Sequence, residues 1–220
     1  MARVEDAEAE DASRPRKPTR KNGIKTYETL LGAVEKVLET KSARSLSIYD
    51  IAEAAGVPPA SVYHFFPSPV AAVVALSEVF LEEVQTLLLE QIEAEAVREW
   101  RDLARIQSER MKQFYDSNRV ARNVLAGVDY LFPVRQLDLA GNKRLAQIML
   151  EQFAEHFVLP ERDDLIEKFE VMVTIHSAIT ALSIVQYGEF TAKLEDDAYR
   201  ASVNFLEDYV PRNLPRKATG

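Results

Sequence analysis

Residues 46–68 read LSIYDIAEAAGVPPASVYHFFPS, which is typical of two short helices joined by a tight turn. Ser47 is placed to cap the first helix, and Asp50 stands three residues on, as in a capping box. Gly56 suits the turn, because a residue without a Cβ atom adopts a positive φ at little cost. Pro59 suits the first turn of the second helix, where its missing N–H group loses no hydrogen bond. The segment therefore predicts a helix-turn-helix, whose second helix would lie in the major groove of DNA.

The spacing of the small residues leaves a second interpretation open. Ala52 and Gly56 let the two helices approach closely, and Ile51, Val57 and Val62 supply apolar contacts between them. The same spacing fits an ordinary corner between two helices of a bundle. On spacing alone, the segment suits both a DNA-reading motif and a structural corner.

Residues 57–68 resemble the recognition-helix signature of the tetracycline-repressor (TetR) family of bacterial transcriptional regulators. In that signature a valine and a small-residue helix start precede Tyr, a second aromatic residue or His, and Phe, and a long fourth helix follows. Residues 46–57 resemble the family's preceding helix, and the likeness covers about residues 23–90. It implies an all-α fold, with an N-terminal three-helix helix-turn-helix module joined by the long fourth helix to a helical ligand-binding and dimerisation domain.

The resemblance also assigns roles to individual residues. Those that open the second helix would face base edges, whereas Tyr63 and His64 would reach phosphates or thymine methyl groups. Phe65 and Phe66 are expected to pack beneath that helix. The resemblance implies DNA contacts at Ser47, Tyr49, Pro59, Ala60, Ser61, Tyr63 and His64, and we add Arg20 and Lys21 of the basic arm to this set.

Three positions depart from the family pattern. Pro69 stands where many members place a phosphate-binding lysine, Ala60 replaces a frequent glycine, and Tyr49 stands where arginine is common. Fewer cationic contacts imply a shallower salt dependence of DNA binding, or greater reliance on the basic residues of the N-terminal arm. Those residues are Arg16, Lys17, Arg20 and Lys21.

The net charge of −8 is spread unevenly along the chain. Residues 1–11 have a net charge of −4, whereas residues 12–66 carry nine basic and five acidic residues, a net charge of +4. We expect residues 1–22 to form a disordered arm, because they lack apolar periodicity and combine prolines with charge. This arm is either a solubilising tail or a segment that contacts nucleic acid.

In the remainder of the chain, apolar residues recur at three- and four-residue steps, which predicts a series of consecutive α-helices. A long helix is expected from Ser68 to near Glu95, about 40 Å in length. The other helices are expected at about 97–115, 118–131, 134–157, 161–187 and 194–209. Gly141 is a candidate break in the helix at 134–157. We assign residues 1–22 to the arm, 23–67 to the helix-turn-helix DNA-binding domain, 68–210 to the helical ligand-binding and dimerisation domain, and 211–220 to a tail.

The last two predicted helices suit a dimer interface. The first of them, at 161–187, is apolar nearly all round and must be buried on two sides. In the TetR family these helices pair with those of a second subunit in a four-helix bundle, although an internal core of a monomer has the same pattern. The interface is predicted at Ser177, Ala178, Ala181, Ala198, Ala201 and Phe205.

An inducer pocket is expected among the helices between the DNA-binding module and the dimer bundle. An apolar lining favours a small hydrophobic or aromatic ligand over a sugar or a nucleotide. Aromatic residues and methionines at helical spacing are also usual in a plain core. The predicted lining is Phe114, Tyr130, Phe153, Phe157, Met172 and His176.

Composition argues against an enzyme. The chain has no cysteine and only three histidines, none with a glutamate three residues before it, and it lacks a Gly-rich phosphate loop. We therefore expect no metal and no cofactor. No run of about 18 apolar residues and no secretory leader is evident, so we expect a cytoplasmic, nucleoid-associated protein. The expected function is a homodimeric DNA-binding regulator, in most family members a repressor, released from a palindromic operator by its ligand. A helical adaptor that uses the motif to bind another protein is the alternative.

Overall fold

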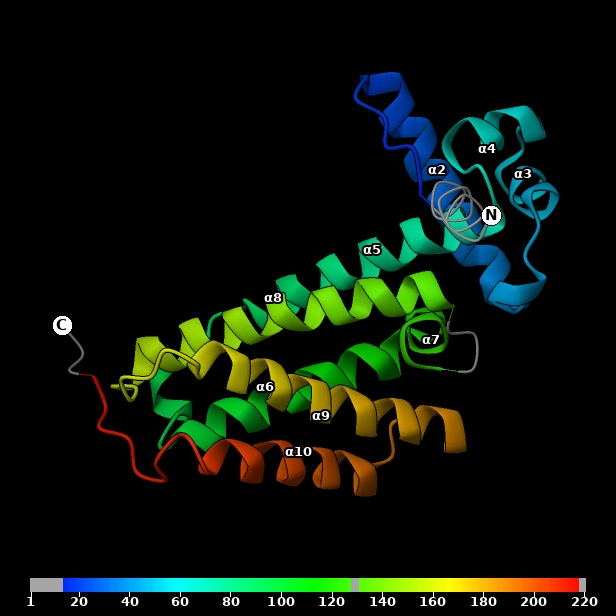
Figure 1. Cartoon of the computed structure of the whole chain (residues 1–220). Helices are drawn as coiled ribbons and strands as arrows, with labels where there is room; N and C mark the ends of the chain where they lie inside the picture. Colours follow the sequence, from blue (N-terminus) through cyan, green and yellow to red (C-terminus); the bar gives the residue numbers. More distant parts are fainter. Residues whose placement is uncertain (1–13, 128–130, 218–220) are drawn as a thin grey trace, which may run out of the picture. The chain divides into compact units, whose positions relative to one another are not determined.

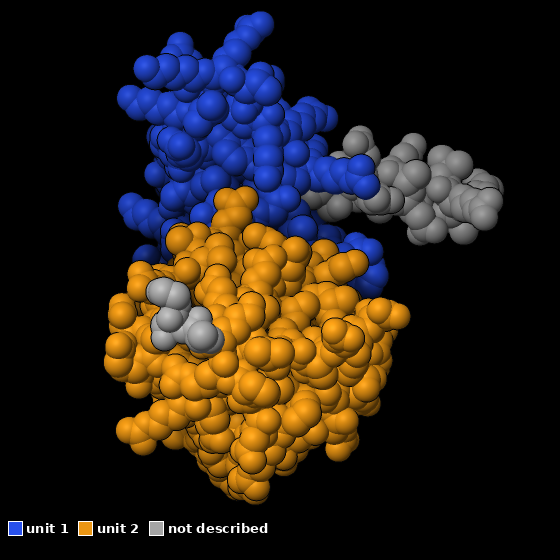
Figure 2. Space-filling model, turned by 90° about the vertical axis from the view of Figure 1, so that its left-hand side faces the viewer, with its two compact units in different colours: residues 1–80, 119–137 blue, residues 81–118, 138–220 orange. Residues whose placement is uncertain are grey.

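The computed structural model describes residues 14–127 and 131–217, which form two compact units (Figure 2). Unit 1 comprises Met1–Phe80 with Arg119–Leu137, and unit 2 comprises Leu81–Asn118 with Asp138–Gly220. Within the described residues the regular structure is helical, apart from one isolated bridge between Phe157 and Arg216. The all-α fold predicted from the sequence is therefore confirmed.

Unit 1 is built around the predicted helix-turn-helix (Figure 1). Its elements in chain order are α2 (Lys21–Leu38), the 3-10 turn η1 (Ala43–Ser45), α3 (Ile48–Ala55), α4 (Pro59–Phe65), the first part of α5 (Pro69–Leu88), α7 (Arg119–Ala121), the π-helical turn η3 (Arg122–Ala126) and the first residues of α8 (Phe132–His156). α2 is amphipathic, and the face that carries Tyr27, Leu30 and Val34 is buried.

The described part of the predicted arm is held against unit 1. The Arg16 N–H donates to the Phe65 carbonyl at 2.8 Å, and Lys17 Nζ lies 2.9 Å from a carboxylate oxygen of Glu78. α2 begins at Lys21, two residues earlier than expected. Residues 14–20 are thus placed by a backbone hydrogen bond and an ion pair that the local composition does not reveal, whereas residues 1–13 lie outside the described residues.

Unit 2 contains the end of α5 and five further elements. They are the 3-10 turn η2 (Ala94–Ala96), α6 (Trp100–Ser117), most of α8, α9 (Leu165–Tyr187) and α10 (Ala192–Glu207), and α9 packs extensively against α10. α8 continues without a break through Gly141, where an added Cβ atom would lie 3.6 Å from the Leu81 side chain. This glycine permits close packing and does not interrupt the helix.

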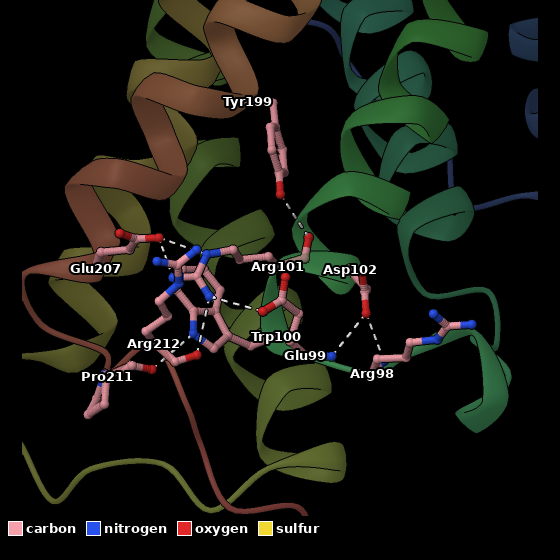
Figure 3. Close-up of polar contacts among 9 residues, drawn as sticks. All are labelled: Arg98, Glu99, Trp100, Arg101, Asp102, Tyr199, Glu207, Pro211 and Arg212. Atoms are coloured by element: carbon pink, nitrogen blue, oxygen red, sulfur yellow. Dashed lines mark hydrogen bonds and ion pairs between the residues drawn. The ribbon is translucent and has the colours of Figure 1, made fainter.

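The first turn of α6 is tied to α10 and to the C-terminal segment by side chains that Figure 3 shows. The Trp100 indole N–H donates to the Pro211 carbonyl at 3.0 Å. Arg101 Nε donates to a carboxylate oxygen of Glu207 at 2.7 Å, and Arg101 Nη1 donates to the Arg212 carbonyl at 3.2 Å. The described part of the predicted tail, residues 211–217, is therefore docked onto unit 2.

α9 is long and apolar enough to cross a membrane by length and composition, with a mean hydropathy of 1.4 over an 18-residue window. The sequence patterns did not predict such a segment. One-third of that window is buried within the protomer, against neighbours that include α10. The core helix of a soluble protein passes the same test, so this observation by itself assigns no membrane role.

Candidate DNA-binding interface and ligand cavity

α3 begins with a complete capping box, which fixes how the chain enters the motif. The Asp50 N–H donates to Ser47 Oγ at 3.2 Å, and Asp50 Oδ2 accepts from the Ser47 N–H at 3.0 Å and from its O–H at 2.8 Å. Lys41 Nζ donates to the other carboxylate oxygen at 2.6 Å. The hydrogen bonds from Lys41 and Ser47 hold the pKa of Asp50 below its usual range. The Ser47 hydroxyl is thus engaged in the cap, which makes Ser47 a residue that positions α3.

The turn between α3 and α4 has the geometry expected from Gly56. Its φ is +65°, in the left-handed region, and the Val57 N–H donates to the Ala52 carbonyl at 3.0 Å. Ile51, Ala52 and Val62 are buried between the helices, as predicted. These contacts hold α4 at a fixed angle to α3 and leave its opposite face in solvent.

The exposed face of α4 presents most of the residues predicted to contact DNA. Ala60, Tyr63 and His64 are exposed, with Tyr63 at 46%, and Pro59 and Ser61 are half-buried at the start of the helix. On α3, Tyr49 is 66% exposed. The structure therefore brings these side chains to the solvent-facing side of one helix pair.

Phe65 and Phe66 form the opposite, buried side of α4. The ring of Tyr27 on α2 lies 5.7 Å from that of Phe65 and 5.2 Å from that of Phe66. Burial, with a smaller contribution from the negative charge of Glu78, raises the pKa of Tyr27 to about 12. The two phenylalanines anchor α4 to α2, which confirms the prediction that they pack beneath the helix.

Positive charge is available beside the motif. Arg20 and Lys21 are exposed at the start of α2, as predicted. Arg44 is also exposed, in η1 just before α3, and the sequence analysis missed it because the residue belongs to neither predicted helix. Lys41, in contrast, is engaged with Asp50.

Unit 2 contains a cavity lined by residues of α5, α6, α8, α9 and α10. Of the predicted ligand contacts, Met172 and His176 line it. Phe114, Phe153 and Phe157 do not: they are buried in the core, where Phe153 packs against Trp100 and Phe169, and Tyr130 lies outside the described residues. The prediction missed the lining residues Gln107, Ser108, Met111 and Met149, because helical periodicity marks a buried face without showing whether it meets a cavity.

His176 is the titratable group of the cavity. Its Nε2 lies 2.9 Å from Ser108 Oγ, and its ring meets that of Phe190 edge-on at 5.9 Å. Burial lowers the pKa of His176 to about 4, so the imidazole is neutral at pH 7. No lining residue of the cavity carries a formal charge at that pH.

The residues predicted for a dimer interface lie in different environments. Ala178 is exposed, and Ala181, Ala201 and Phe205 are half-buried. Ser177 lines the cavity, and Ala198 is fully buried inside the protomer, so Ala198 is not available to a partner.

The outward face of α9 carries an apolar stripe that the sequence analysis did not identify. Its members repeat at steps of four and three residues and are exposed, except for the half-buried Ile175. The stripe consists of Val171, Ile175, Ala178, Leu182 and Val185. This is the spacing of a helix seam that packs against another helix.

Residues 30–68 match the family model described as bacterial regulatory proteins, tetR family. Solved structures with a similar fold include a TetR-family transcriptional regulator from Streptomyces coelicolor, which is 18% identical, with a TM-score of 0.62 over 84% of this chain and 99% of that one. The fatty acid degradation regulator FadR from Bacillus halodurans is 13% identical, with a TM-score of 0.58 over 85% and 96%. The dihydroxyacetone kinase operon activator DhaS is 14% identical, with a TM-score of 0.57 over 84% and 98%. No curated protein sequence matches the chain.

The family match and the fold agree with each other. Residues 30–68 contain α3 and α4, the helix pair whose caps, turn and exposed face are described above. The solved regulators share the helical fold over more than four-fifths of the chain. Members of the family are transcription factors and not enzymes. Residues 30–68 thus match the DNA-binding region of the TetR family of bacterial transcriptional regulators, and the chain has the fold of solved regulators of that family.

Proposed function

We propose that the protein binds a palindromic operator as a homodimer, in the bacterial cytoplasm at the nucleoid, and that a small apolar ligand releases it. The observation that carries this proposal is the exposed face of α4. Tyr63 is an aromatic side chain held in solvent by a helix whose other side is anchored through Phe65 and Phe66. An exposed aromatic ring on a rigid recognition helix suits contact with a base edge or a phosphate.

The proposed dimer is supported by the stripe on α9. Leu182 and Val185 are 46% and 52% exposed, and the stripe extends over most of the helix. An exposed apolar seam of this length is typical of a surface that packs against another protein. A second copy of α9 and α10 would cover it, and two copies of α4 would then read the two halves of a palindrome.

The proposed sign of regulation is repression, as in most members of the family. The relative titled an operon activator shares the fold, so the sign rests on the family's general behaviour and not on a feature of this chain. The proposed ligand is small and apolar because methionine, leucine, valine and alanine make up most of the residues that line the cavity.

The proposal is tested by selecting the genomic DNA fragments that the protein binds and measuring their affinity for variants. Tyr63→Ala should weaken binding at least tenfold without a large change in thermal stability. The matched control is Tyr187→Ala, since Tyr187 is an exposed tyrosine of α9 at 62%. Ser61→Ala should relax the preference at one base pair by about 1–3 kcal/mol.

The result also separates the regulator from a helical adaptor. A regulator binds duplex DNA with an affinity that falls as the salt concentration rises, whereas an adaptor that contacts only proteins shows no such binding. Equal affinities of wild type and Tyr63→Ala for every selected fragment would overturn the proposed role of α4.

A further inference from the structure

One residue that lines the cavity of unit 2 has a buried polar atom without a hydrogen-bond partner among the described residues. Gln107, on α6, lines the cavity and is 3% exposed, and its Oε1 atom accepts no hydrogen bond. A buried acceptor left unsatisfied costs roughly 1–3 kcal/mol. A ligand that donates a hydrogen bond to this atom would remove that cost.

The orientation of the Gln107 amide is fixed by its neighbours. Its Nε2 donates to the Leu88 carbonyl at 3.0 Å and also to Gln152 Oε1. Gln152 Nε2 donates to the same Leu88 carbonyl at 2.6 Å. Rotating the Gln107 amide by 180° would set its oxygen against the Leu88 carbonyl oxygen, so both N–H groups stay engaged and Oε1 stays free.

The other polar hydrogens of the cavity wall are also engaged. Thr180 donates its O–H to the His176 carbonyl at 3.0 Å, so its Oγ1 can only accept from His176 Nδ1, at 3.5 Å. This arrangement assigns the His176 proton to Nδ1, and Nε2 then accepts from Ser108. Ser177 donates to Asn142 Oδ1 at 3.4 Å, and Ser202 donates to the Tyr199 carbonyl at 3.0 Å. The lining side chains thus offer hydrogen-bond acceptors but no spare donor.

The size and flexibility of the wall limit the ligand further. The cavity volume is about 50 Å³, which is room for roughly four water molecules. Of the four methionines in the chain, Met111, Met149 and Met172 all line this cavity. Because unbranched methionine side chains rearrange easily, the wall can widen to admit a single ring.

We propose that the cavity binds a small, neutral, largely apolar molecule that carries one hydroxyl or N–H group and donates it to Gln107 Oε1. This inference rests on the proposed function, since it names the chemical class of the releasing ligand. A carboxylate or phosphate ligand is disfavoured, because the wall holds no cation and offers no free donor. A pure hydrocarbon would fit the apolar wall but leave the Gln107 acceptor unsatisfied.

The test uses three probes of similar size, namely phenol, toluene and benzoate, on the full-length protein at pH 7. Binding is followed by NMR of ¹³C-methyl methionine, because three of the four methyl signals report on the cavity wall. Phenol should shift the signals of Met111, Met149 and Met172 and bind at least as tightly as toluene, although phenol is the more strongly hydrated of the two. Benzoate should bind at least tenfold more weakly than phenol.

Two variants isolate the acceptor. Gln107→Leu removes Oε1 and should weaken phenol at least tenfold while changing the affinity for toluene less than threefold. Ser202→Ala is the matched control, since it also removes a polar group from the cavity wall but leaves the Gln107 amide and its partners in place. It should keep the phenol-to-toluene affinity ratio of the wild type.

The proposal is overturned if no probe shifts the cavity methionines, if benzoate binds as tightly as phenol, or if Gln107→Leu leaves the phenol-to-toluene ratio unchanged. If Gln107→Leu does not fold, the wild-type probe series decides, and toluene binding more than tenfold tighter than phenol contradicts the proposal. Affinity for the selected genomic fragments is measured on the same preparations. A protein that binds those fragments but ignores phenol overturns only the ligand class, whereas one that binds no fragment specifically overturns the proposed function.

Discussion

His176 is an ionisable side chain held neutral inside unit 2, with Ser108 and Thr180 at its two ring nitrogens. Burial lowers its pKa from 6.5 to about 4, so the unfolded chain takes up a proton at a higher pH than the folded one. The stability from this group is therefore complete above about pH 6.5 and declines as the pH falls toward 4. The full loss corresponds to about 3 kcal/mol.

This effect predicts a specific difference between the wild type and His176→Gln. Urea unfolding at pH 7 and at pH 4.5 should show a smaller loss of stability in the variant, because the variant has no imidazole to protonate. Carboxylates titrate in both proteins, so the comparison isolates His176. Equal losses in the two proteins would show that the imidazole does not resist protonation in the fold.

Gln107 shows at the residue scale what the sequence could not reveal. Apolar periodicity identified Met172 and His176 as buried, and both line the cavity. The same reasoning selected Phe153 and Phe157, which fill the core. Whether a buried face meets another side chain or an empty space depends on the packing of several helices, and a single amphipathic pattern contains no information about that.

At the scale of elements, local chemistry predicted the helix-turn-helix because its signals are short-range. The Ser47–Asp50 capping box and the positive φ of Gly56 each involve residues close in sequence. The end of α5 was predicted near Glu95 but lies at Leu88, whose carbonyl accepts from Gln107 and Gln152. These partners lie 19 and 64 residues further along the chain, so no local pattern could place that helix end.

The start of α2 should contribute to DNA binding through charge. Changing both Arg20 and Lys21 to Gln should reduce the slope of log K against log salt by about 2, since each phosphate contact contributes roughly 0.9. Lys36→Gln is the control, because Lys36 is an exposed cation in the last turn of the same helix. A slope that the double variant does not change would mean that the start of α2 does not touch phosphates.

The stripe on α9 should hold the dimer together. Leu182→Glu would place a charge in the proposed seam and should yield monomers or aggregates, as measured by light scattering. Tyr187→Glu is the matched control, since residue 187 is exposed on the same helix about 200° around from Val185. A wild-type mass of about 24.9 kDa at micromolar concentration would contradict the dimer.

At the scale of the whole molecule, α5 is the element that would link the two proposed functions, DNA binding and ligand binding. It begins at Pro69, four residues after the end of α4, and ends at Leu88 in the wall of the cavity. A ligand can change DNA affinity only through a difference in its affinity for the DNA-bound and free proteins. We expect that difference to act through α5.

Ligand and operator should therefore weaken each other equally. A hundredfold loss of operator affinity at saturating ligand corresponds to about 2.7 kcal/mol of coupling, and operator DNA must weaken ligand binding by the same hundredfold. Titrating the ligand into the free and the operator-bound protein measures this directly. A molecule that binds both forms with equal affinity is not the releasing ligand.

The most direct test of the central claim is the stoichiometry and footprint of the protein on the genomic fragments that it selects. Two protomers of a dimer reading a palindrome should protect two half-sites about 34–36 Å apart, in successive major grooves. Sedimentation should find two protomers, or a multiple of two, on each specific fragment, with an affinity well above that for random duplex DNA. Binding to genomic fragments no tighter than to random DNA, or one protomer on an unpaired site, would contradict the account.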